Sequence, residues 1–161
     1  MTNMTDNAGG RIAAVSPENT TVGIVGLGDM GAAIASSIVR TFPLIAFDLR
    51  KEAVDKLVAL GAKRAESVQA LADQCEVIIL VVVDDKQVNQ VVSELLCHRG
   101  KLHTIIVSST VLPTTVVALR EQASKVGLEL IDALVSGGVE KVSVGTIIVL
   151  IDGEQATIQK C

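Results

Sequence analysis

A glycine motif that follows a short apolar segment constrains this chain more than any other feature. The segment Val22–Val25 precedes Gly26-Leu27-Gly28-Asp29-Met30-Gly31, and small aliphatic residues follow. Strand, glycine turn and helix in this order are typical of folds that bind dinucleotides. The first glycine makes the tight turn, the second lets the backbone approach a pyrophosphate, and the third lets helix and strand pack closely. The sequence therefore predicts a phosphate site at a helix N-terminus.

An acidic residue follows the next apolar segment and bears on the choice of cofactor. Asp48 comes directly after Leu44–Phe47, where a carboxylate accepts hydrogen bonds from the adenosine ribose and repels a 2′-phosphate. Arg50 could instead pair with that phosphate. We expect NAD, because Arg50 lies two residues beyond the acid and its side chain can point away from it. NADP remains the alternative through Arg50.

The rest of the chain alternates between apolar segments and helical patterns. Strands are expected near 62–65, 77–83, 102–107, 128–131 and 147–151. Helices are expected at 51–60, from 68, at 86–96, at 114–126 and after 153. About seven strands joined by helices predict an α/β fold of the Rossmann type, a doubly wound, mainly parallel sheet with helices on both faces.

Two adjacent acids, Asp84 and Asp85, end the longest apolar run. One interpretation is that they cap the helix at 86–96, because carboxylates favour a helix N-terminus. The other is that their loop lines the cofactor cleft, because ligands bind beyond the carboxyl ends of parallel strands.

Composition argues against several classes of partner. The net charge is −4 and Phe42 and Phe47 are the only aromatic residues, so neither a basic patch nor a stacking surface for nucleic acid is expected. The longest apolar run is too short to span a membrane. Three cysteines and two histidines show no ligand spacing, so no metal site is expected. This cysteine usage suits a reducing cytoplasm.

We expect one folded unit. Residues 1–19 are polar and are interpreted as a disordered leader, 20–153 as the dinucleotide-binding Rossmann domain, and 154–161 as the start of a helix. A helix that stops soon after it starts is an unusual end for a domain. We therefore expect a truncated protein whose helix leads into a second domain absent from this chain.

Three motifs resemble the β-hydroxyacid dehydrogenases, the family of 3-hydroxyisobutyrate dehydrogenase and tartronate semialdehyde reductase. The first is the glycine motif with Asp48, and the second is Ser109-Thr110 followed by Pro113. The third is Asp132-Ala133-Leu134-Val135-Ser136-Gly137-Gly138-Val139, followed by Gly145-Thr146. The third is the most specific, because a general nucleotide-binding fold does not require it. Val107, Leu134 and Asp152 depart from the family pattern, which makes this chain a divergent member.

The resemblance implies hydride transfer between a nicotinamide cofactor and a small 3-hydroxy acid or its semialdehyde or ketone. Ser136, Gly137 and Gly138 would hold the substrate carboxylate, since adjacent glycine N–H groups form a concavity that binds anions. Without the resemblance, these residues would be interpreted as an ordinary turn, and Ser109 and Thr110 as a helix cap. The expected cofactor contacts are Gly26, Leu27, Gly28, Asp29, Met30, Gly31, Asp48, Leu49, Arg50, Val83, Asp84, Ser109 and Thr110.

The resemblance places the acid–base lysine in an all-helical second domain that also supplies the dimer contact. We therefore expect no catalytic residue in this chain, little turnover by it alone, and a homo-oligomer at full length. Lys141 matches no catalytic motif and is interpreted as a solvated charge. Two alternatives stay open: a nucleotide-binding module without catalysis, and another enzyme on a similar fold, such as a methyltransferase that uses S-adenosylmethionine.

Overall fold

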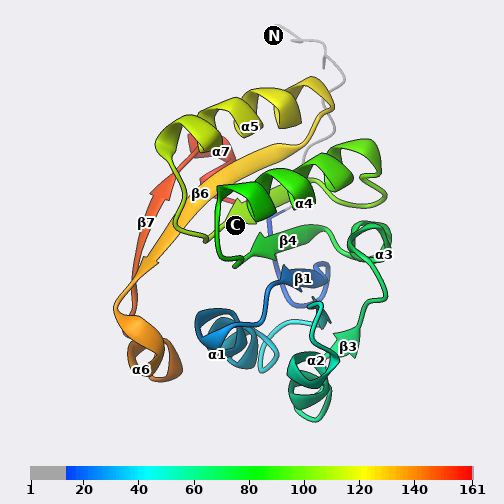
Figure 1. The fold of residues 1–161 in the computed structure, drawn as a ribbon, viewed down its shortest axis with the longest axis vertical. Helices are drawn as coiled ribbons and strands as arrows, with labels where there is room; N and C mark the ends of the chain where they lie inside the picture. The colour runs from blue at the N-terminus through cyan, green and yellow to red at the C-terminus, as the bar shows by residue number, and fades with distance from the viewer. Residues whose placement is uncertain (1–13, 161) are drawn as a thin grey trace, which may run out of the picture.

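A computed structural model describes residues 14–160 and contains one seven-stranded sheet with helices around it (Figure 1). The strands are β1 (Val22–Val25), β2 (Leu44–Phe47), β3 (Lys63–Arg64), β4 (Val77–Leu80), β5 (Thr104–Val107), β6 (Glu129–Ser136) and β7 (Ile148–Asp152). The helices are α1 (Asp29–Ile38), α2 (Lys51–Val58), α3 (Val68–Gln74), α4 (Asp85–Cys97), α5 (Pro113–Lys125), α6 (Gly138–Ser143) and α7 (Gln155–Ile158).

The sheet has the strand order β3-β2-β1-β4-β5-β6-β7. The first six strands run parallel, and β7 pairs antiparallel with β6. This order confirms the predicted Rossmann-type, mainly parallel sheet. The order reverses between β1 and β4, which is the point at which such folds bind a dinucleotide.

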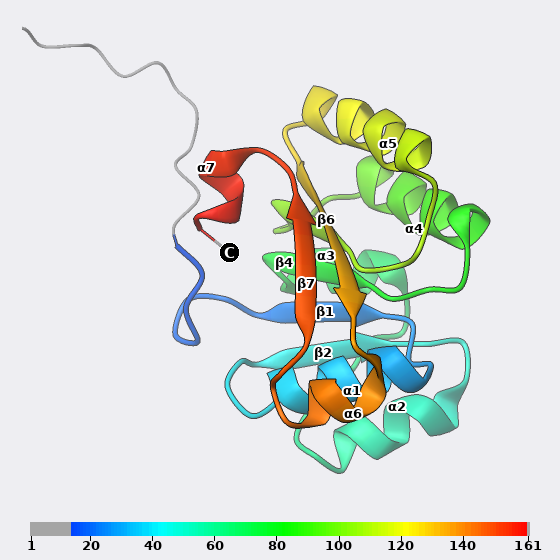
Figure 2. The same cartoon turned by 90° about the vertical axis from the view of Figure 1, so that its left-hand side faces the viewer.

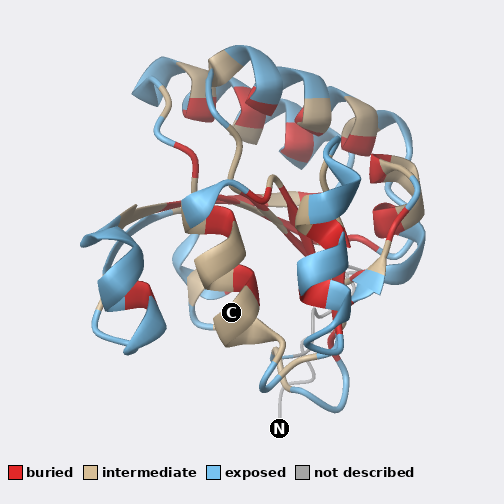
Figure 3. Ribbon diagram, turned by 60° about the horizontal axis from the view of Figure 1, so that its bottom comes forward, coloured by how far each residue is buried: buried red, intermediate tan, exposed pale blue. Residues whose placement is uncertain are grey.

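Helices cover both faces of the sheet, and each face has its own apolar core. Helices α1 and α2 pack on one face with Ala35, Val54 and Leu57, and α3, α4 and α5 pack on the other. Neighbouring residues of β1 serve the two cores in turn, Ile24 on one side and Val25 on the other. Figure 3 shows that the buried residues of the helices lie on the sides that face the sheet. Coverage of both faces explains why the strands read as continuous apolar runs.

Two predicted strand bounds were wrong. Strand β4 ends at Leu80, so the last three residues of the run at 77–83 leave the sheet and form the loop before α4. Strand β6 reaches Ser136 instead of ending at 131, because β7 pairs with its second half, from Asp132↔Asp152 to Ser136↔Ile148. A local apolar pattern does not reveal that distant partner.

The two ends of the described segment, residues 14–160, lie near each other. Residues 1–13 of the expected leader, and Cys161, lie outside the described residues. Residues 14–19, expected to belong to the same leader, include a turn, and the Val15 N–H donates to the Lys160 carbonyl oxygen at 2.7 Å. Helix α7 spans four residues after the loop at Gly153.

Two glycines of the motif leave no space for a side chain, Gly26 in the turn and Gly31 where helix and strand were predicted to pack closely. Gly26 has a φ of +93°, and a Cβ there would lie 2.3 Å from the Val81 carbonyl oxygen. A Cβ on Gly31 would lie 2.0 Å from the Gly26 carbonyl oxygen. Helix α1 therefore approaches the end of β1 at a distance that only glycine allows.

Replacing Gly31 with alanine tests this packing. Alanine in a helix is usually favoured over glycine by about 1 kcal/mol. Here we expect Gly31→Ala to lower the free energy of unfolding by about 2 kcal/mol, because the added methyl group has no space. Urea unfolding followed by circular dichroism measures it. Gly28→Ala is the control, since a Cβ there meets nothing within 4 Å. A Gly31→Ala protein as stable as the wild type would contradict the packing argument.

Candidate functional site

The N-terminus of α1 presents an open backbone at the centre of the sheet's carboxyl edge. Gly28 is its N-cap, so no side chain caps the helix, and the φ of −64° at Gly28 suits any residue. The space where a Cβ would lie is empty for 4 Å. Asp29, which is exposed, and Met30 form the first helical turn. The free N–H groups and the helix dipole at this end favour an anion.

Asp48 ties the glycine loop to the end of β2. The Leu27 N–H donates to Asp48 Oδ2 at 2.6 Å, and the Arg50 N–H donates to Asp48 Oδ1 at 2.8 Å. The Arg50 side chain adds Nε to Oδ1 at 3.2 Å and Nη2 to the Leu27 carbonyl oxygen at 3.0 Å. The expectation that Arg50 points away from Asp48 is therefore wrong. The guanidinium folds back because a carboxylate and a carbonyl oxygen both lie within its reach.

These contacts set the charge of Asp48. Partial burial raises the pKa of its carboxyl group, but the hydrogen bonds from Arg50 and Leu27 outweigh burial and bring the pKa below its ordinary value. Asp48 is therefore ionised at neutral pH. Each carboxylate oxygen already accepts hydrogen bonds from the protein, so a ribose diol must share or displace Arg50 to reach it.

Two large aliphatic side chains stand exposed at the same edge. Leu49, after β2, is 90% exposed, and Val83, after β4, is 82% exposed. Strand β1 lies between β2 and β4, so the two strand ends are about 10 Å apart. A single exposed aliphatic residue needs no explanation, but here two large ones stand on opposite sides of the glycine loop.

The loop after β4 is held from both ends. Asp84 caps α4, since its Oδ1 accepts from the Gln87 N–H at 2.9 Å, and the Gln87 side chain accepts from the Val83 N–H at 3.0 Å. The capping interpretation is confirmed for Asp84, and the spacing of Asp84 and Gln87 indicates it from sequence. Sequence reasoning missed that Asp85 Oδ1 accepts from the Leu112 N–H at 3.0 Å and from the Thr115 hydroxyl at 2.6 Å. These hydrogen bonds, with that of Thr115 the larger, lower the pKa of Asp85.

Ser109 is buried, and its hydroxyl makes hydrogen bonds to two backbone groups of the protein. Its Oγ accepts from the Val82 N–H at 2.8 Å and donates to the Leu80 carbonyl oxygen at 3.4 Å. It thereby joins the loop after β5 to the end of β4. Thr110 beside it is exposed. The cofactor contacts expected of Ser109 and Thr110 stay predictions.

The Ser136-Gly137-Gly138 segment ends β6 and begins α6, and all three residues are exposed. Gly137 and Gly138 have φ of +131° and +75°, which favours glycine at both positions. Helix α6 lies beside α1 (Figure 2), and the Ser37 hydroxyl of α1 donates to the Val142 carbonyl oxygen at 3.5 Å. Strand β6 is three strand spacings from β1, about 14 Å, so a ligand in contact with both ends must be extended.

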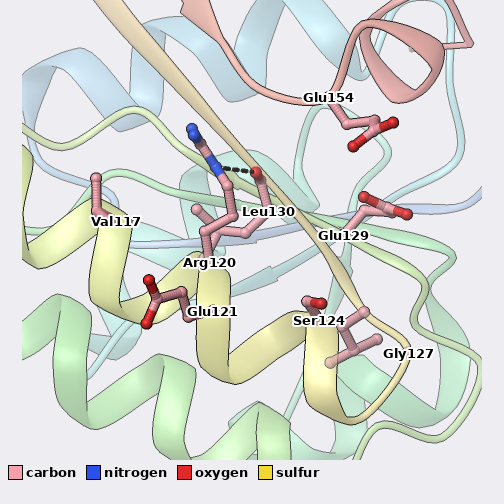
Figure 4. Close-up of a pocket in the computed structure, with 9 residues that line it drawn as sticks. Val117, Arg120, Glu121, Ser124, Gly127, Glu129, Leu130 and Glu154 are labelled. Atoms are coloured by element: carbon pink, nitrogen blue, oxygen red, sulfur yellow. Dashed lines mark hydrogen bonds between the residues drawn. The ribbon is translucent and has the colours of Figure 1, made fainter.

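Two hollows differ in their relation to these residues. One of about 350 Å³ lies beside the glycine loop and is lined by Gly28, Asp29, Arg50 and residues of α1 and α2. The other, of about 380 Å³, lies between α5, β6 and the loop before α7 (Figure 4). It is at the amino end of β6, the opposite edge of the sheet, so it is not part of the candidate site. Within residues 14–160 no cluster of His, Cys, Asp and Glu is arranged to bind a metal, and no helix there could span a membrane.

Comparison with known proteins connects the site to a family. Residues 21–161 match the family described as the NAD binding domain of 6-phosphogluconate dehydrogenase. The chain belongs to this family. The prediction of a nicotinamide dinucleotide cofactor is thereby confirmed for this NAD-binding domain.

Relatives of this NAD-binding domain include 3-hydroxyisobutyrate dehydrogenases, as the resemblance implied, and other dehydrogenases. The chain is 31% identical over 143 residues to an NAD-dependent L-serine dehydrogenase from Pseudomonas aeruginosa, covering 86% of this chain and 48% of that protein. It is 34% identical over 137 residues to a mitochondrial 3-hydroxyisobutyrate dehydrogenase from Drosophila melanogaster, covering 84% and 42%. A solved structure of Mycobacterium tuberculosis 3-hydroxyisobutyrate dehydrogenase with L-serine is similar to this chain with a TM-score of 0.80 at 25% identity, covering 86% of this chain and 48% of that one. The chain spans about half the length of these relatives.

The charge on Asp48 makes part of the stability of this NAD-binding domain depend on pH. Because the folded pKa is lowered, the stabilisation is complete above the unfolded value of about 3.9 and is lost as pH falls through the folded pKa. The side chain of the Asp48→Asn variant is uncharged at every pH, so this contribution to stability is absent from the variant. We expect it to be less stable than the wild type at pH 7, and the gap to shrink at pH 3. Urea unfolding at the two pH values measures the gap, and an equal gap at both would contradict the assignment.

Proposed function

We propose that this chain is the cofactor-binding unit of an oxidoreductase that transfers a hydride between NAD and a small 3-hydroxy acid or its semialdehyde or ketone. The observation that supports it most directly is the open backbone at Gly28. Gly26 and Gly31 are required by packing, whereas Gly28 has free space and an ordinary φ, so the fold alone does not need a glycine there. The advantage of a glycine at position 28 is that a ligand can approach the backbone there from outside the protein.

In this proposal the dinucleotide lies across the carboxyl edge of the sheet. Its pyrophosphate contacts the backbone of residues 26–31 at the N-terminus of α1. The adenosine ribose donates to Asp48, and the adenine ring lies between Leu49 and Val83. The Asp84 loop borders the same cleft. The ribose gains its contact with Asp48 as the Arg50 guanidinium moves aside.

The substrate half of the proposal rests on β6 and β5. The N–H groups of Gly137 and Gly138 and the hydroxyl of Ser136 suit a carboxylate, and these groups are exposed at the same edge of the sheet as the glycine loop. Thr110, also exposed, lies at the end of β5, the strand next to β6, so the nicotinamide and the substrate would meet beside it. The bound nicotinamide supplies the hydride chemistry. The residues of this chain bind and orient, because no lysine here matches the acid–base residue that the resemblance implies.

NAD is proposed over NADP from the state of the two deciding side chains. Asp48 is ionised and would repel a 2′-phosphate, and Arg50 is held by Asp48 and by the Leu27 carbonyl oxygen. To pair with Arg50, the 2′-phosphate of NADP would have to displace the guanidinium from these contacts. The same phosphate would then lie close to the negative charge of Asp48.

Gly28→Val tests the proposed function through the cofactor. We expect the Kd for NADH, measured by NADH fluorescence, to rise at least about tenfold, because the side chain occupies the space the pyrophosphate needs. The thermal unfolding midpoint should stay close to that of the wild type, since the added atoms meet no protein atom at Cβ. An unchanged Kd would refute the site. Binding of S-adenosylmethionine without NADH or NADPH would favour the methyltransferase alternative.

Arg50→Ala tests the cofactor choice. We expect the wild type to bind NADH more tightly than NADPH, and Arg50→Ala to keep NADH affinity within about threefold, because its contacts are to the protein. Asp48→Ala should weaken NADH binding at least about tenfold, since it removes charged hydrogen bonds to the ribose. Tighter binding of NADPH that Arg50→Ala abolishes would reverse the choice.

A further inference from the structure

The residues that follow β4 pack directly behind the glycine turn. A Cβ on Gly26 would lie 2.3 Å from the Val81 carbonyl oxygen and 3.0 Å from Cγ1 of Val82. A Cβ on Gly31 would lie 3.4 Å from Cβ of Val81. Backbone and side chains of this segment therefore limit where the glycine turn can lie. Because protein interiors are close-packed, a shift of Val81 or Val82 would move the turn or leave a gap behind it.

Val81 and Val82 lie beyond β4, and each is held by a different neighbour. The Val81 N–H donates to the Val25 carbonyl oxygen at 2.9 Å, which continues the ladder with β1 by one residue. The pairing of β4 with β5 has already ended one residue before Val81. On that side the Val82 N–H donates to Ser109 Oγ at 2.8 Å. The segment is thus fixed between β1 and the loop after β5.

The Ser109 hydroxyl takes the place of a backbone acceptor. In a continued parallel ladder, the Val82 N–H would donate to a carbonyl oxygen of the β5 chain. The two chains diverge here, and this partly buried N–H receives a side-chain acceptor instead. The Ser109 hydroxyl also donates to the Leu80 carbonyl oxygen at 3.4 Å, which accepts from the Ser108 N–H at 2.9 Å as well. Ser109 therefore completes the hydrogen bonding at the point where β4 and β5 separate.

Ser109 is enclosed by the protein, whereas its neighbour is not. Ser109 is 3% exposed, and Thr110 is exposed at the same edge of the sheet as the glycine loop. A buried hydroxyl that both accepts and donates within the protein acts on a ligand through the groups it holds. The group that it holds most closely is the backbone of Val82, and the exposed Val83 follows directly.

We propose that Ser109 is a positioning residue of the dinucleotide site. By holding the Val82 N–H, it fixes Val81 and Val82 behind the glycine turn and sets where Val83 emerges at the cleft. This role rests on the proposed function, in which the pyrophosphate contacts that turn. It divides the adjacent Ser109 and Thr110 between two tasks: Ser109 positions the backbone, and Thr110 is free to meet the ligand.

Ser109→Ala tests the role through the cofactor. The variant removes the acceptor of the Val82 N–H, so we expect the Kd for NADH, measured by NADH fluorescence, to rise about fivefold. Ser108→Ala is the matched control. Its contact with the Leu80 carbonyl oxygen comes from a backbone N–H, which alanine keeps. Its Kd should stay within about twofold of the wild-type value.

A second control separates positioning from a loss of stability. Val92→Ala deletes two buried methyl groups from α4 in the apolar core. It should lower the thermal unfolding midpoint at least as much as Ser109→Ala does. We expect its Kd for NADH to stay within about twofold of the wild-type value, because its side chain does not hold the segment behind the glycine turn. An equal rise in Kd for Val92→Ala and Ser109→Ala would refute a positioning role.

Amide hydrogen exchange tests the contact without a ligand. In the wild type, the Val82 N–H should exchange at least about tenfold more slowly than the Val83 N–H, whose acceptor is the exposed Gln87 side chain. Ser109→Ala should abolish this difference. Equal exchange of the two amides in the wild type would overturn the proposal, and that result does not depend on whether the variant folds.

Gly28→Val distinguishes failure of this role from failure of the proposed function. If Gly28→Val weakens NADH binding and a folded Ser109→Ala protein binds as the wild type does, the positioning role is wrong and the site remains. If neither variant weakens binding, the site itself is wrong, and the positioning role is wrong with it.

Discussion

The close approach of α1 to the end of β1 is the constraint on which the site depends. Gly31 faces the Gly26 carbonyl oxygen with no space for a methyl group, and Gly26 faces Val81, the residue after β4, in the same way. The N-terminus of α1 is thereby aimed at the point where the strand order reverses. A side chain at either glycine would move the helix outward and take its free N–H groups away from the edge where ligands bind.

The loops around this helix end are tied to one another before any ligand arrives. Asp48 joins the glycine loop to β2, Ser109 joins the loop after β5 to β4, and Asp85 joins the loop after β4 to α5. In each of these contacts, a side-chain oxygen accepts a hydrogen bond from a backbone N–H or a hydroxyl of another segment. The cleft is therefore largely preformed, and Arg50 is the side chain that must move for a ribose to reach Asp48.

Much of this could be predicted from sequence because it is local. The roles of Gly26 and Gly31, the cap at Asp84 and the alternation of strands and helices all depend on residues close together in the chain. The orientation of Arg50 was not predictable, because its acceptors are fixed by a turn geometry that the sequence does not show. The length of β6 depends on β7, and the ties made by Asp85 depend on residues about 30 positions away.

In the proposed function, a dinucleotide contacts the backbone of the glycine loop and the acid after β2. A titration of the ¹⁵N-labelled chain with NADH tests it residue by residue. We expect shifts in the amide signals of Leu27, Gly28 and Met30, of Arg50, and of Val83, and no shift of Gly127, which lies at the amino end of β6. Shifts confined to the hollow around Gly127, or no shifts in the glycine loop at saturating NADH, would contradict it.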